Sequence, residues 1–361
     1  MESTPNITII GAGLIGLSTA EALASRGANV TVLEARPGPC EGTSFSNSGM
    51  IHPSQAQTWD PNKKAASQHT LAKQDAAKVT ADLGARSREI LLTQIKSLGL
   101  ASRPDGCLKI YPDFDAARAA QTTYNQIGVR ANILMDPIDT LGQAACHFPN
   151  DSSGDSRVFG CALAADLTAK GVEFIYNASD VDIRRKEDGF SIRASSGLIN
   201  ADHLIIAAGI QTVDLLARLE LRMQLNAISG AAMDFALPEI KEDLPSCPVM
   251  DAVSRSAMTV FEDRVRISGG WQLTDPAPLL ERWADLAPGL MLRLGKPIST
   301  WTGIRPVSPA GRPYISSTSI PKLWVNTGHG HMGWTLCAGS GELMAQMILE
   351  GRQDRRFAYS G

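Results

Sequence analysis

The sequence predicts an α/β protein with a second, α+β domain built on an antiparallel sheet. Three observations lead to this fold class. An apolar run of strand length, a glycine-rich turn and a helical pattern follow one another at residues 7–34, and the same order returns at residues 323–349. Between them, the hydrophobic pattern of residues 225–268 shifts toward a period of two, which is typical of antiparallel strands. The two ends of the chain are therefore expected to share one domain.

The composition is that of an ordinary globular protein of about two domains, with 361 residues of which 43% are hydrophobic and 20% charged. A net charge of −3 without a basic cluster speaks against nucleic-acid binding. No apolar run approaches the ~18 residues that a membrane span needs. The N-terminus enters the first strand without room for a signal peptide, so we expect a cytoplasmic protein. The six cysteines form no C-x-x-C pair, so neither a metal site nor a disulfide framework is predicted.

The N-terminal segment ITIIGAGLIG has the form of a strand, a tight turn and a helix. Each glycine has a separate role in such a motif. Gly11 allows the sharp turn, Gly13 lets backbone N–H groups approach a pyrophosphate, and Gly16 lets the helix pack close to the strand. The phosphates would then lie at the positive end of the helix. On its own the motif is weak evidence, because glycine also serves ordinary turns.

A second strand at Asn29–Leu33 strengthens this interpretation, because it delivers Glu34 at its carboxyl end. A carboxylate at that place can accept hydrogen bonds from the two hydroxyls of a ribose. An acidic residue there argues against NADP, while Arg36 could touch the adenosine ribose or the phosphates. The segment therefore predicts a Rossmann-like dinucleotide-binding domain, and by itself it does not separate NAD from FAD.

The next part of the chain alternates loop, helix and strand. Residues 37–53 are rich in Gly, Ser, Asn and Pro, and should form a loop that either lines a cofactor or lies on the surface. A helical excursion is predicted over residues 63–100, a strand at 106–111, and a helix at 113–127 that Asp113 caps. Further elements are expected as a helix at 158–170, a strand at 173–176, a hairpin of Val181–Arg185 and Phe190–Ala194, and a buried parallel strand at His203–Ile210. The antiparallel strands should lie at 227–233, 257–261 and 265–267, with a helix at 276–286.

The C-terminal segment repeats the order of the N-terminal one. A strand at residues 323–326 leads into a glycine-rich turn and then into a helix at residues 334–349. One helix start suffices for a pyrophosphate, so a second one indicates another place where negative charge gathers. A flavin meets that need, because its reduction places negative charge on the N1–C2 edge of the ring. His329 in this turn either donates to the ring or packs structurally.

Arg305 precedes Pro306, which pushes it into an extended conformation, and it follows an apolar run that resembles a strand. Such an arginine can project from a sheet into a cavity, where its guanidinium is well shaped to hold a carboxylate through two parallel hydrogen bonds. A surface or ion-paired arginine is the alternative. In that case the anchor would be sought among Arg255, Arg264 and Arg266.

Six segments stand out together: GAGLIG, TSFSNSG at Thr43–Gly49, SGDSRVF, AAG at Ala207–Gly209, TGIRPVSPAGRP at Thr302–Pro313 and NTGHGHMGWT at Asn326–Thr335. Together they resemble the D-amino acid oxidase superfamily of FAD-dependent oxidoreductases, and most of all its bacterial D-amino acid dehydrogenases. The likeness covers nearly the whole chain. The Ser-Asn loop and the G-H-G turn are far more specific than the nucleotide motif.

The resemblance implies that FAD binds at both glycine turns. Its ADP half would be held by Gly11, Gly13, Gly16 and Glu34, and the arginine of the G-x-R-P motif, Arg305, would bind the substrate carboxylate. Two segments would run beside the isoalloxazine: Ser44, Asn47, Ser48, Gly49 and Met50, and Gly330, Met332, Gly333, Trp334 and Thr335. The remaining cofactor contacts are expected at Leu14, Ile15, Ala35, Arg36, Val181, Ala208 and Gly209.

The chain also departs from the family pattern. It is shorter than typical D-amino acid dehydrogenases, with the loss between His52 and Asp151, which leaves the substrate and any membrane docking open. Sarcosine oxidases of the superfamily attach their flavin to a cysteine near the G-x-R-P motif. Residues 301–304 contain no cysteine and Cys337 falls inside the last helix, so we expect noncovalent FAD.

We therefore expect oxidative deamination of an amino acid, in particular a D-amino acid, to a 2-oxo acid and ammonia, with hydride transfer from the substrate Cα to flavin N5. Arg305 would position the substrate, and His52 is a candidate proton acceptor, although the chemistry does not strictly require one. The FAD-binding domain should comprise residues 1–52, 151–224 and 302–361, and the substrate domain residues 53–150 and 225–301.

Alternatives remain open from the sequence. The first is another reaction of the same superfamily, with glycine, a sarcosine-type N-methyl amino acid or a 2-hydroxy acid as substrate. The second is a nucleotide-binding sensor that does not turn over. No motif in the sequence identifies the electron acceptor, which can be oxygen, a quinone or a carrier protein. The sequence also leaves peripheral membrane contact and the oligomeric state open.

Overall fold

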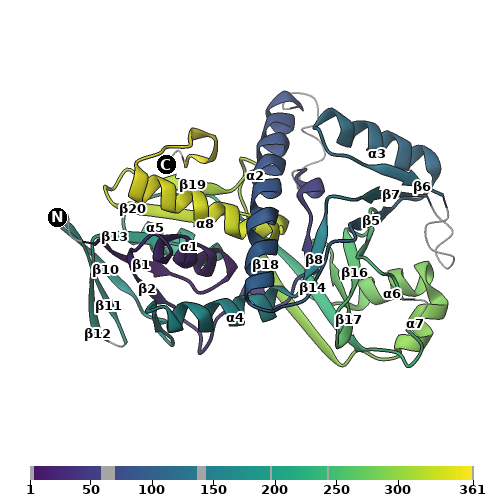
Figure 1. The fold of residues 1–361 in the computed structure, drawn as a ribbon, viewed down its shortest axis with the longest axis horizontal. Coiled ribbons are helices and arrows are strands. Elements are labelled where there is room, and N and C mark those ends of the chain that lie inside the picture. Colours follow the sequence, from purple (N-terminus) through teal and green to yellow (C-terminus); the bar gives the residue numbers. More distant parts are fainter. Residues whose placement is uncertain (1–3, 58–69, 136–143, 196, 242–243, 360–361) are drawn as a thin grey trace.

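The computed structural model describes residues 4–57, 70–135, 144–195, 197–241 and 244–359 (Figure 1). Two large sheets dominate this part of the chain, one of six strands and one of eight. In Figure 1 the six-stranded sheet lies on the left and the eight-stranded sheet on the right, and the long helix α2 (Thr70–Ser97) passes between them. The predicted fold class, α/β with a second sheet-based part, is confirmed.

The six-stranded sheet is parallel except at its edge strand β19. Its strands lie in the order β19 (Tyr314–Ser317), β20 (Leu323–Thr327), β13 (His203–Ile206), β1 (Asn6–Ile10), β2 (Asn29–Leu33) and β9 (Glu173–Ile175). The central strands are almost continuously apolar because helices and a small sheet cover both faces. Their register brings Ile10, Leu33 and Ile206 side by side, so the turns that follow these strands share one edge.

Helices α1 (Leu14–Ala24) and α8 (Gly333–Glu350) pack against each other beside this sheet (Figure 1). Their contact is close, because a Cβ on Gly341 would lie 2.3 Å from the carbonyl oxygen of Ser18. Helix α4 (Ser156–Ala169) also packs on α1, and its N-terminus is capped by the carboxylate of Asp155. The nucleotide-type turns at both ends of the chain are thereby held in one rigid layer.

The eight-stranded sheet is antiparallel with one exception. Its order is β18 (Ser299–Val307), β14 (Asn226–Ala236), β17 (Arg264–Gly269), β16 (Ser256–Val260), β15 (Val249–Asp251), β5 (Cys107–Ile110), β7 (Ala145–Phe148) and β6 (Asn132–Leu134). The pair β15 and β5 is parallel, which corrects the expectation of a purely antiparallel sheet. Helices α6 (Ala277–Leu286) and α7 (Pro288–Leu294) cover one face with a core that includes the buried Trp283. Helix α3 (Phe114–Gln126) packs on β6 and β7.

Two small sheets and a short helix complete the described sheets and α-helices. One sheet consists of β10 (Asp182–Lys186), β11 (Gly189–Ala194) and β12 (Gly197–Ala201), and the other of β3 (Met50–Ile51), β8 (Ser152–Gly154) and β4 (Ser102–Arg103). The short helix α5 (Thr212–Ala217) follows β13. The first small sheet includes the predicted hairpin, and the second brings the end of the 37–53 loop against the segment before α4.

Most predicted elements are confirmed, and the differences have local causes. Part of the helix predicted over residues 63–100 lies outside the described residues, and α2 accounts for the rest. The strand predicted at His203–Ile210 ends at Ile206, because Gly209 has a φ of 60° and the chain turns into a 3₁₀ turn at Gly209–Gln211. Several short elements were missed, since segments this short carry little periodic signal. They are β3, β4, β6, β7, β8, β12, β15, β19, α5 and α7.

The division into two domains stays a prediction. Its boundary between residues 301 and 302 falls inside β18, which continues the eight-stranded sheet to Val307. Among the residues that the structure describes, no helix combines the length and the apolar character that crossing a membrane would demand.

Candidate active site

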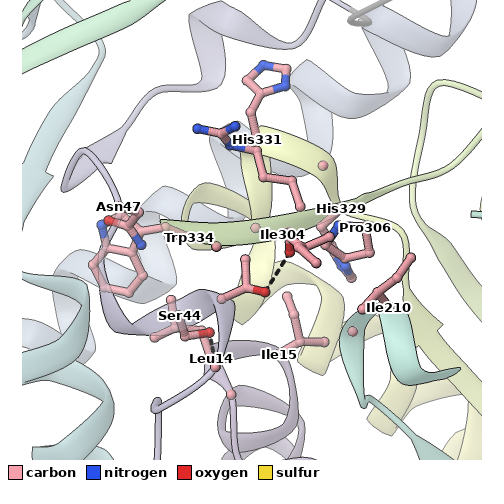
Figure 2. Close-up of a pocket in the computed structure, with 18 of the residues that line it drawn as sticks. Leu14, Ile15, Ser44, Asn47, Ile210, Ile304, Pro306, His329, His331 and Trp334 are labelled. Carbon is pink, nitrogen blue, oxygen red and sulfur yellow. Dashed lines mark hydrogen bonds between the residues drawn. The ribbon is translucent and has the colours of Figure 1, made fainter. Parts of the chain in front are cut away.

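A cavity of about 1030 Å³ lies between the shared edge of β1, β2 and β13 and the eight-stranded sheet. Its lining combines the turns after these three strands with side chains from β5, β14, β17 and β18. The space outside the carboxyl ends of parallel strands is where α/β sheets bind their ligands, and the volume is that of a large ligand pocket. Figure 2 shows Leu14 and Ser44 at one end of the cavity and His331 at the other.

Helix α1 presents its N-terminus to one end of the cavity. Gly13 precedes the helix without a side-chain cap, and the backbone N–H of Leu14 donates to Ser44 Oγ at 3.1 Å. Gly11 has a φ of 112°, and a Cβ there would lie 2.6 Å from the carbonyl oxygen of Ala207, so only glycine fits this turn. A helix start held open in this way suits an anionic group such as a phosphate.

Glu34 lies at the end of β2 and lines the same end of the cavity. Its Oε2 accepts a hydrogen bond from the backbone N–H of Ala12 at 2.7 Å, and its Oε1 accepts one from the backbone N–H of Arg36 at 3.0 Å. Both bonds hold the carboxylate beside the glycine turn. Each carboxylate oxygen keeps further lone pairs, so the group can still accept from ribose hydroxyls.

The loop of residues 43–50 forms part of the wall and is fixed by bonds to two other segments and by one bond within the loop. Thr43 Oγ1 donates to the carbonyl oxygen of Ile304 at 2.6 Å, which ties the loop to β18 (Figure 2). The indole Nε1 of Trp334, in the first turn of α8, donates to the carbonyl oxygen of Gly49 at 3.3 Å. Asn47 Oδ1 accepts from the backbone N–H of Gly49 at 2.8 Å. Segments from three parts of the sequence thus form one continuous wall.

Arg305 extends from β18 over the neighbouring strand β14 and lines the cavity from the eight-stranded sheet. Its Nη1 donates to the carbonyl oxygens of Ser229 at 3.4 Å and Gly270 at 3.2 Å. The guanidinium lies directly over Gly230, where a Cβ would come within 2.2 Å of Nη1. Burial lowers the pKa of Arg305 to about 10, which leaves it charged at neutral pH.

The alternative anchors are placed differently. Arg266 donates two hydrogen bonds to Asp234, at 2.6 and 2.8 Å, and Arg264 pairs with both Asp155 and Asp234. These ion pairs neutralise both guanidinium groups, and neither arginine lines the cavity. Arg255 does line it, at the side of the eight-stranded sheet. Arg305 and Arg255 are therefore the arginines at the sheet side of the cavity.

Two predicted histidines line the cavity and are deeply buried. His52 Nδ1 lies 3.2 Å from Thr335 Oγ1, and His329 Nε2 lies 2.8 Å from Ser340 Oγ. Burial lowers the pKa of His52 to about 4 and that of His329 to about 3. Both rings are therefore neutral at physiological pH, and each is engaged by a hydroxyl.

Sequence reasoning missed several residues of the cavity. Lys109 of β5 and Gln55 line it together with His331, whose Nε2 bonds the carbonyl oxygen of Gln55 at 2.9 Å. Burial lowers the pKa of His331 to about 3. His331 lies within the G-H-G-H turn and could have been found there, whereas no pattern around Lys109 or Gln55 indicates a site.

Most of the predicted site residues line the cavity. They are Arg305, His52, His329, Gly11, Gly13, Leu14, Ile15, Glu34, Ala35, Arg36, Ser44, Asn47, Ser48, Met50, Val181, Ala208, Gly209, Gly330, Gly333 and Trp334. Residues from at least six separate segments are thereby brought together, although their roles in binding stay a prediction.

Four predicted contact residues do not line the cavity, and each has another position. A Cβ on Gly16 would lie 1.8 Å from the carbonyl oxygen of Gly11, so this glycine serves the close packing of α1 on the turn. Gly49 belongs to the 43–50 loop but is buried against Phe261, whose ring would lie 2.6 Å from a Cβ on this glycine. Met332 belongs to the hydrophobic core, and Thr335 is buried beside His52.

Comparison with known proteins identifies the family. A family model described as FAD dependent oxidoreductase matches residues 6–347. The chain belongs to this family. D-amino acid dehydrogenase from Vibrio atlanticus (strain LGP32) is 26% identical over 399 aligned positions, which cover 95% of each chain. The protein is thus an FAD-dependent oxidoreductase, as predicted, and FAD is its cofactor.

Solved structures support the same fold. Iminodiacetate oxidase from Chelativorans sp. BNC1 superimposes with a TM-score of 0.80 at 22% identity, covering 98% of both chains. Glycine oxidase from Geobacillus kaustophilus superimposes with a TM-score of 0.80 at 20% identity, covering 98% of this chain and 96% of that one. At these identities the likeness concerns the fold, and the chemistry of the site has to be argued from its own residues.

The lining residues fit FAD. The open N-terminus of α1 suits the pyrophosphate, and the carboxylate of Glu34 suits the ribose hydroxyls. Helix α8 begins at Gly333 with no side-chain cap and no acidic residue in its first turn. A helix start of this kind suits the edge of a flavin that becomes negative on reduction. The donors and acceptors of the cavity therefore match the two polar ends of FAD.

Proposed function

We propose that this FAD-dependent oxidoreductase oxidises a D-amino acid at the carbon that bears the amine. The imino acid formed is hydrolysed by water to a 2-oxo acid and ammonia. The family and the D-amino acid dehydrogenase of Vibrio atlanticus support the proposal. The observation that carries it is the buried guanidinium of Arg305, which lines the cavity from the eight-stranded sheet.

The site residues divide the work along the cavity. The turn at Gly11 and Gly13 and the carboxylate of Glu34 hold the ADP half of FAD, and the 43–50 loop with Trp334 lies along the flavin. The lining residues that the structure describes include no cysteine, which supports noncovalent attachment. Arg305 then faces the remaining space, where the substrate binds.

Bound FAD supplies the two-electron oxidant. The residues of the chain contribute position: Arg305 holds the substrate carboxylate through two parallel hydrogen bonds and thereby orients the Cα–H bond. Electrons leave a neutral amine more readily than an ammonium group, so the substrate must lose its ammonium proton first. With a pKa of about 4, His52 is a weak proton acceptor at neutral pH, which favours release of that proton to water.

The substrate class is tested by mixing the yellow holoenzyme without oxygen against D-, L- and N-methyl amino acids and 2-hydroxy acids. The flavin absorbance should bleach fastest with D-amino acids. Fastest bleaching by a hydroxy acid or an L-amino acid would overturn the proposal, and so would a lack of bleaching with every compound. Reoxidation of the bleached enzyme by oxygen or by a soluble quinone then identifies the electron acceptor.

The anchor is tested by Arg305→Met, which keeps the length of the side chain and removes its charge. Loss of two charge-assisted hydrogen bonds should cost about 2–5 kcal/mol, or roughly thirty- to several-thousand-fold in kcat/KM. The kcat/KM of Arg305→Lys should fall between those of the wild type and Arg305→Met, because lysine restores the charge without the bidentate geometry. A substrate amine without a carboxylate is the control, and the variant should lose far less with it. Wild-type kcat/KM for the amino acid in Arg305→Met would make Arg305 structural.

A further inference from the structure

Lys109 is placed in the cavity by the alternation of β5. Leu108 and Ile110 of this strand belong to the core beneath α6, so Cys107 and Lys109 point to the opposite face. The parallel pairing with β15 sets Lys109 beside Met250, and both residues line the cavity. A lysine on this face lies at the sheet side, where Arg305 also reaches.

A buried polar network holds the ammonium group in place. Lys109 Nζ donates to Gln55 Oε1 at 2.9 Å and to the hydroxyl oxygen of Tyr124 at 3.0 Å, and this hydroxyl itself donates to Gln55 Oε1 at 3.0 Å. The amide Nε2 of Gln55 donates to Ser54 Oγ at 2.8 Å. Ser54 Oγ in turn donates to Asp151 Oδ2 at 2.5 Å. The buried carboxyl group of Asp151 thereby fixes the orientation of Gln55 through Ser54, and Gln55 in turn holds Lys109 in place before any ligand binds.

The charge of Lys109 has no carboxylate partner among the described residues. Both of its hydrogen bonds go to neutral oxygens, and an ammonium group has three donors. Arg266 and Arg282, by contrast, each donate to a carboxylate, Arg266 to that of Asp234 and Arg282 to that of Asp251. A partly buried cation without a counter-charge costs free energy, and an anion that arrives in the cavity offsets this cost.

Lys109 and Arg305 act on the same part of the cavity. His331 lines the cavity together with both residues, and besides burial the charges of Arg305 and Lys109 contribute to lowering the pKa of this histidine. Its ring bonds the backbone of Gln55, the residue that also holds Lys109. Two fixed cations therefore face the substrate end from different strands, with a neutral histidine ring near both.

We propose that the preferred substrate is a dicarboxylic amino acid, with one carboxylate held by Arg305 and the second by Lys109. This inference rests on the proposed function, because it assigns the first carboxylate to Arg305. It goes further by naming the second binding group and the substrate class. A substrate with a neutral side chain would leave the ammonium of Lys109 desolvated without a counter-charge.

The experiment compares acidic substrates with neutral counterparts on the holoenzyme, measured as anaerobic flavin bleaching. The pairs are D-glutamate with D-glutamine, D-aspartate with D-asparagine, and iminodiacetate with sarcosine. In at least one pair the acidic member should have a kcat/KM about 10- to 100-fold higher, which is the range for a charge-assisted hydrogen bond. Lys109→Met should abolish this preference by lowering kcat/KM for the acidic member alone. Lys109→Arg should keep most of the preference for the acidic member. Lys96→Met, a change on the exposed face of α2, should leave kcat/KM for both members unchanged.

Two results would overturn the inference. One is a wild-type enzyme that prefers the neutral member, or neither member, in all three pairs. The other is a Lys109→Met enzyme in which kcat/KM falls by the same factor for the acidic and the neutral member. If Lys109→Met fails to fold or to hold FAD, the wild-type pairs decide alone.

A binding measurement separates this inference from the proposed function. Succinate and butyrate differ in the second carboxylate, and their binding to the oxidised holoenzyme is followed by the shift of the flavin spectrum. Succinate should bind about tenfold more tightly, and Lys109→Met should remove the difference. This result would support the second anion site even if no amino acid bleached the flavin, whereas equal binding of both acids to the wild type would overturn it.

Discussion

Gly230 offers a way to move the guanidinium of Arg305 without changing its charge. A Cβ added at Gly230 would lie 2.2 Å from Nη1 and 2.4 Å from Nη2, whereas ordinary contact begins at 3.4 Å. In Gly230→Ala the guanidinium must therefore retreat from 2.2 to 3.4 Å, which is a shift of 1.2 Å. The clash involves the far end of a flexible side chain, so β14 should keep its fold.

A displacement of this size has a predictable kinetic effect. Misplacing a positioning group by about 1 Å costs about 100-fold, so kcat/KM for the amino acid substrate should fall by about two orders of magnitude. This corresponds to about 2.7 kcal/mol of lost transition-state stabilisation. FAD content should not change, because Gly230 belongs to β14 of the eight-stranded sheet, whereas the turn at Gly11 and Gly13 and the carboxylate of Glu34 follow strands of the six-stranded sheet. The assay is steady-state turnover with a parallel measurement of bound FAD.

Two controls make this prediction sharp. Gly289→Ala in α7 adds the same methyl group where no atom lies within 4 Å, so activity should stay at the wild-type level. A substrate amine without a carboxylate should be turned over almost equally by wild type and Gly230→Ala. If Gly230→Ala retained full kcat/KM for the amino acid with unchanged FAD content, the position of Arg305 would not matter for catalysis.

Three further predictions concern the cofactor, the packing and the pH dependence. Glu34→Ala should weaken FAD binding by roughly 1–3 kcal/mol, measured by titrating FAD into the apoprotein, since the ribose loses its acceptor; unchanged affinity would contradict the assigned role. Gly341→Ala should lower the free energy of unfolding by about 1–3 kcal/mol in a denaturant titration, because the added Cβ would lie 2.3 Å from the backbone of Ser18. An unchanged midpoint of unfolding would contradict the close contact of α1 and α8. Burial lowers the pKa of His52 to about 4 and that of His331 to about 3. Keeping the two rings neutral therefore contributes fully to the free energy of unfolding above the unfolded pKa near 6.5, and this contribution is lost as the pH falls toward 4 and 3. The midpoint of thermal unfolding should therefore drop between pH 6.5 and 4, and less steeply in His331→Asn; an equal slope in both proteins would contradict this.

The sequence by itself determined the fold class and the nucleotide end of the cavity. A strand, a glycine turn and a helix are encoded within residues 6–24, and Glu34 follows at the end of the next strand. Such a motif is local, so its geometry follows from neighbouring residues and from the steric freedom of glycine. The extended conformation of Arg305 was also predictable, because the proline after it restricts its backbone.

Tertiary structure alone decided which residues complete the substrate end. Lys109 lines the cavity because β5 pairs in parallel with β15, and these strands are separated by more than a hundred residues. Which face of a strand is buried depends on such remote pairing, since a shift by one residue would turn Lys109 into the core. The low pKa values of His52 and His329 likewise arise from burial by distant segments, so the sequence could name these histidines without showing that they stay neutral.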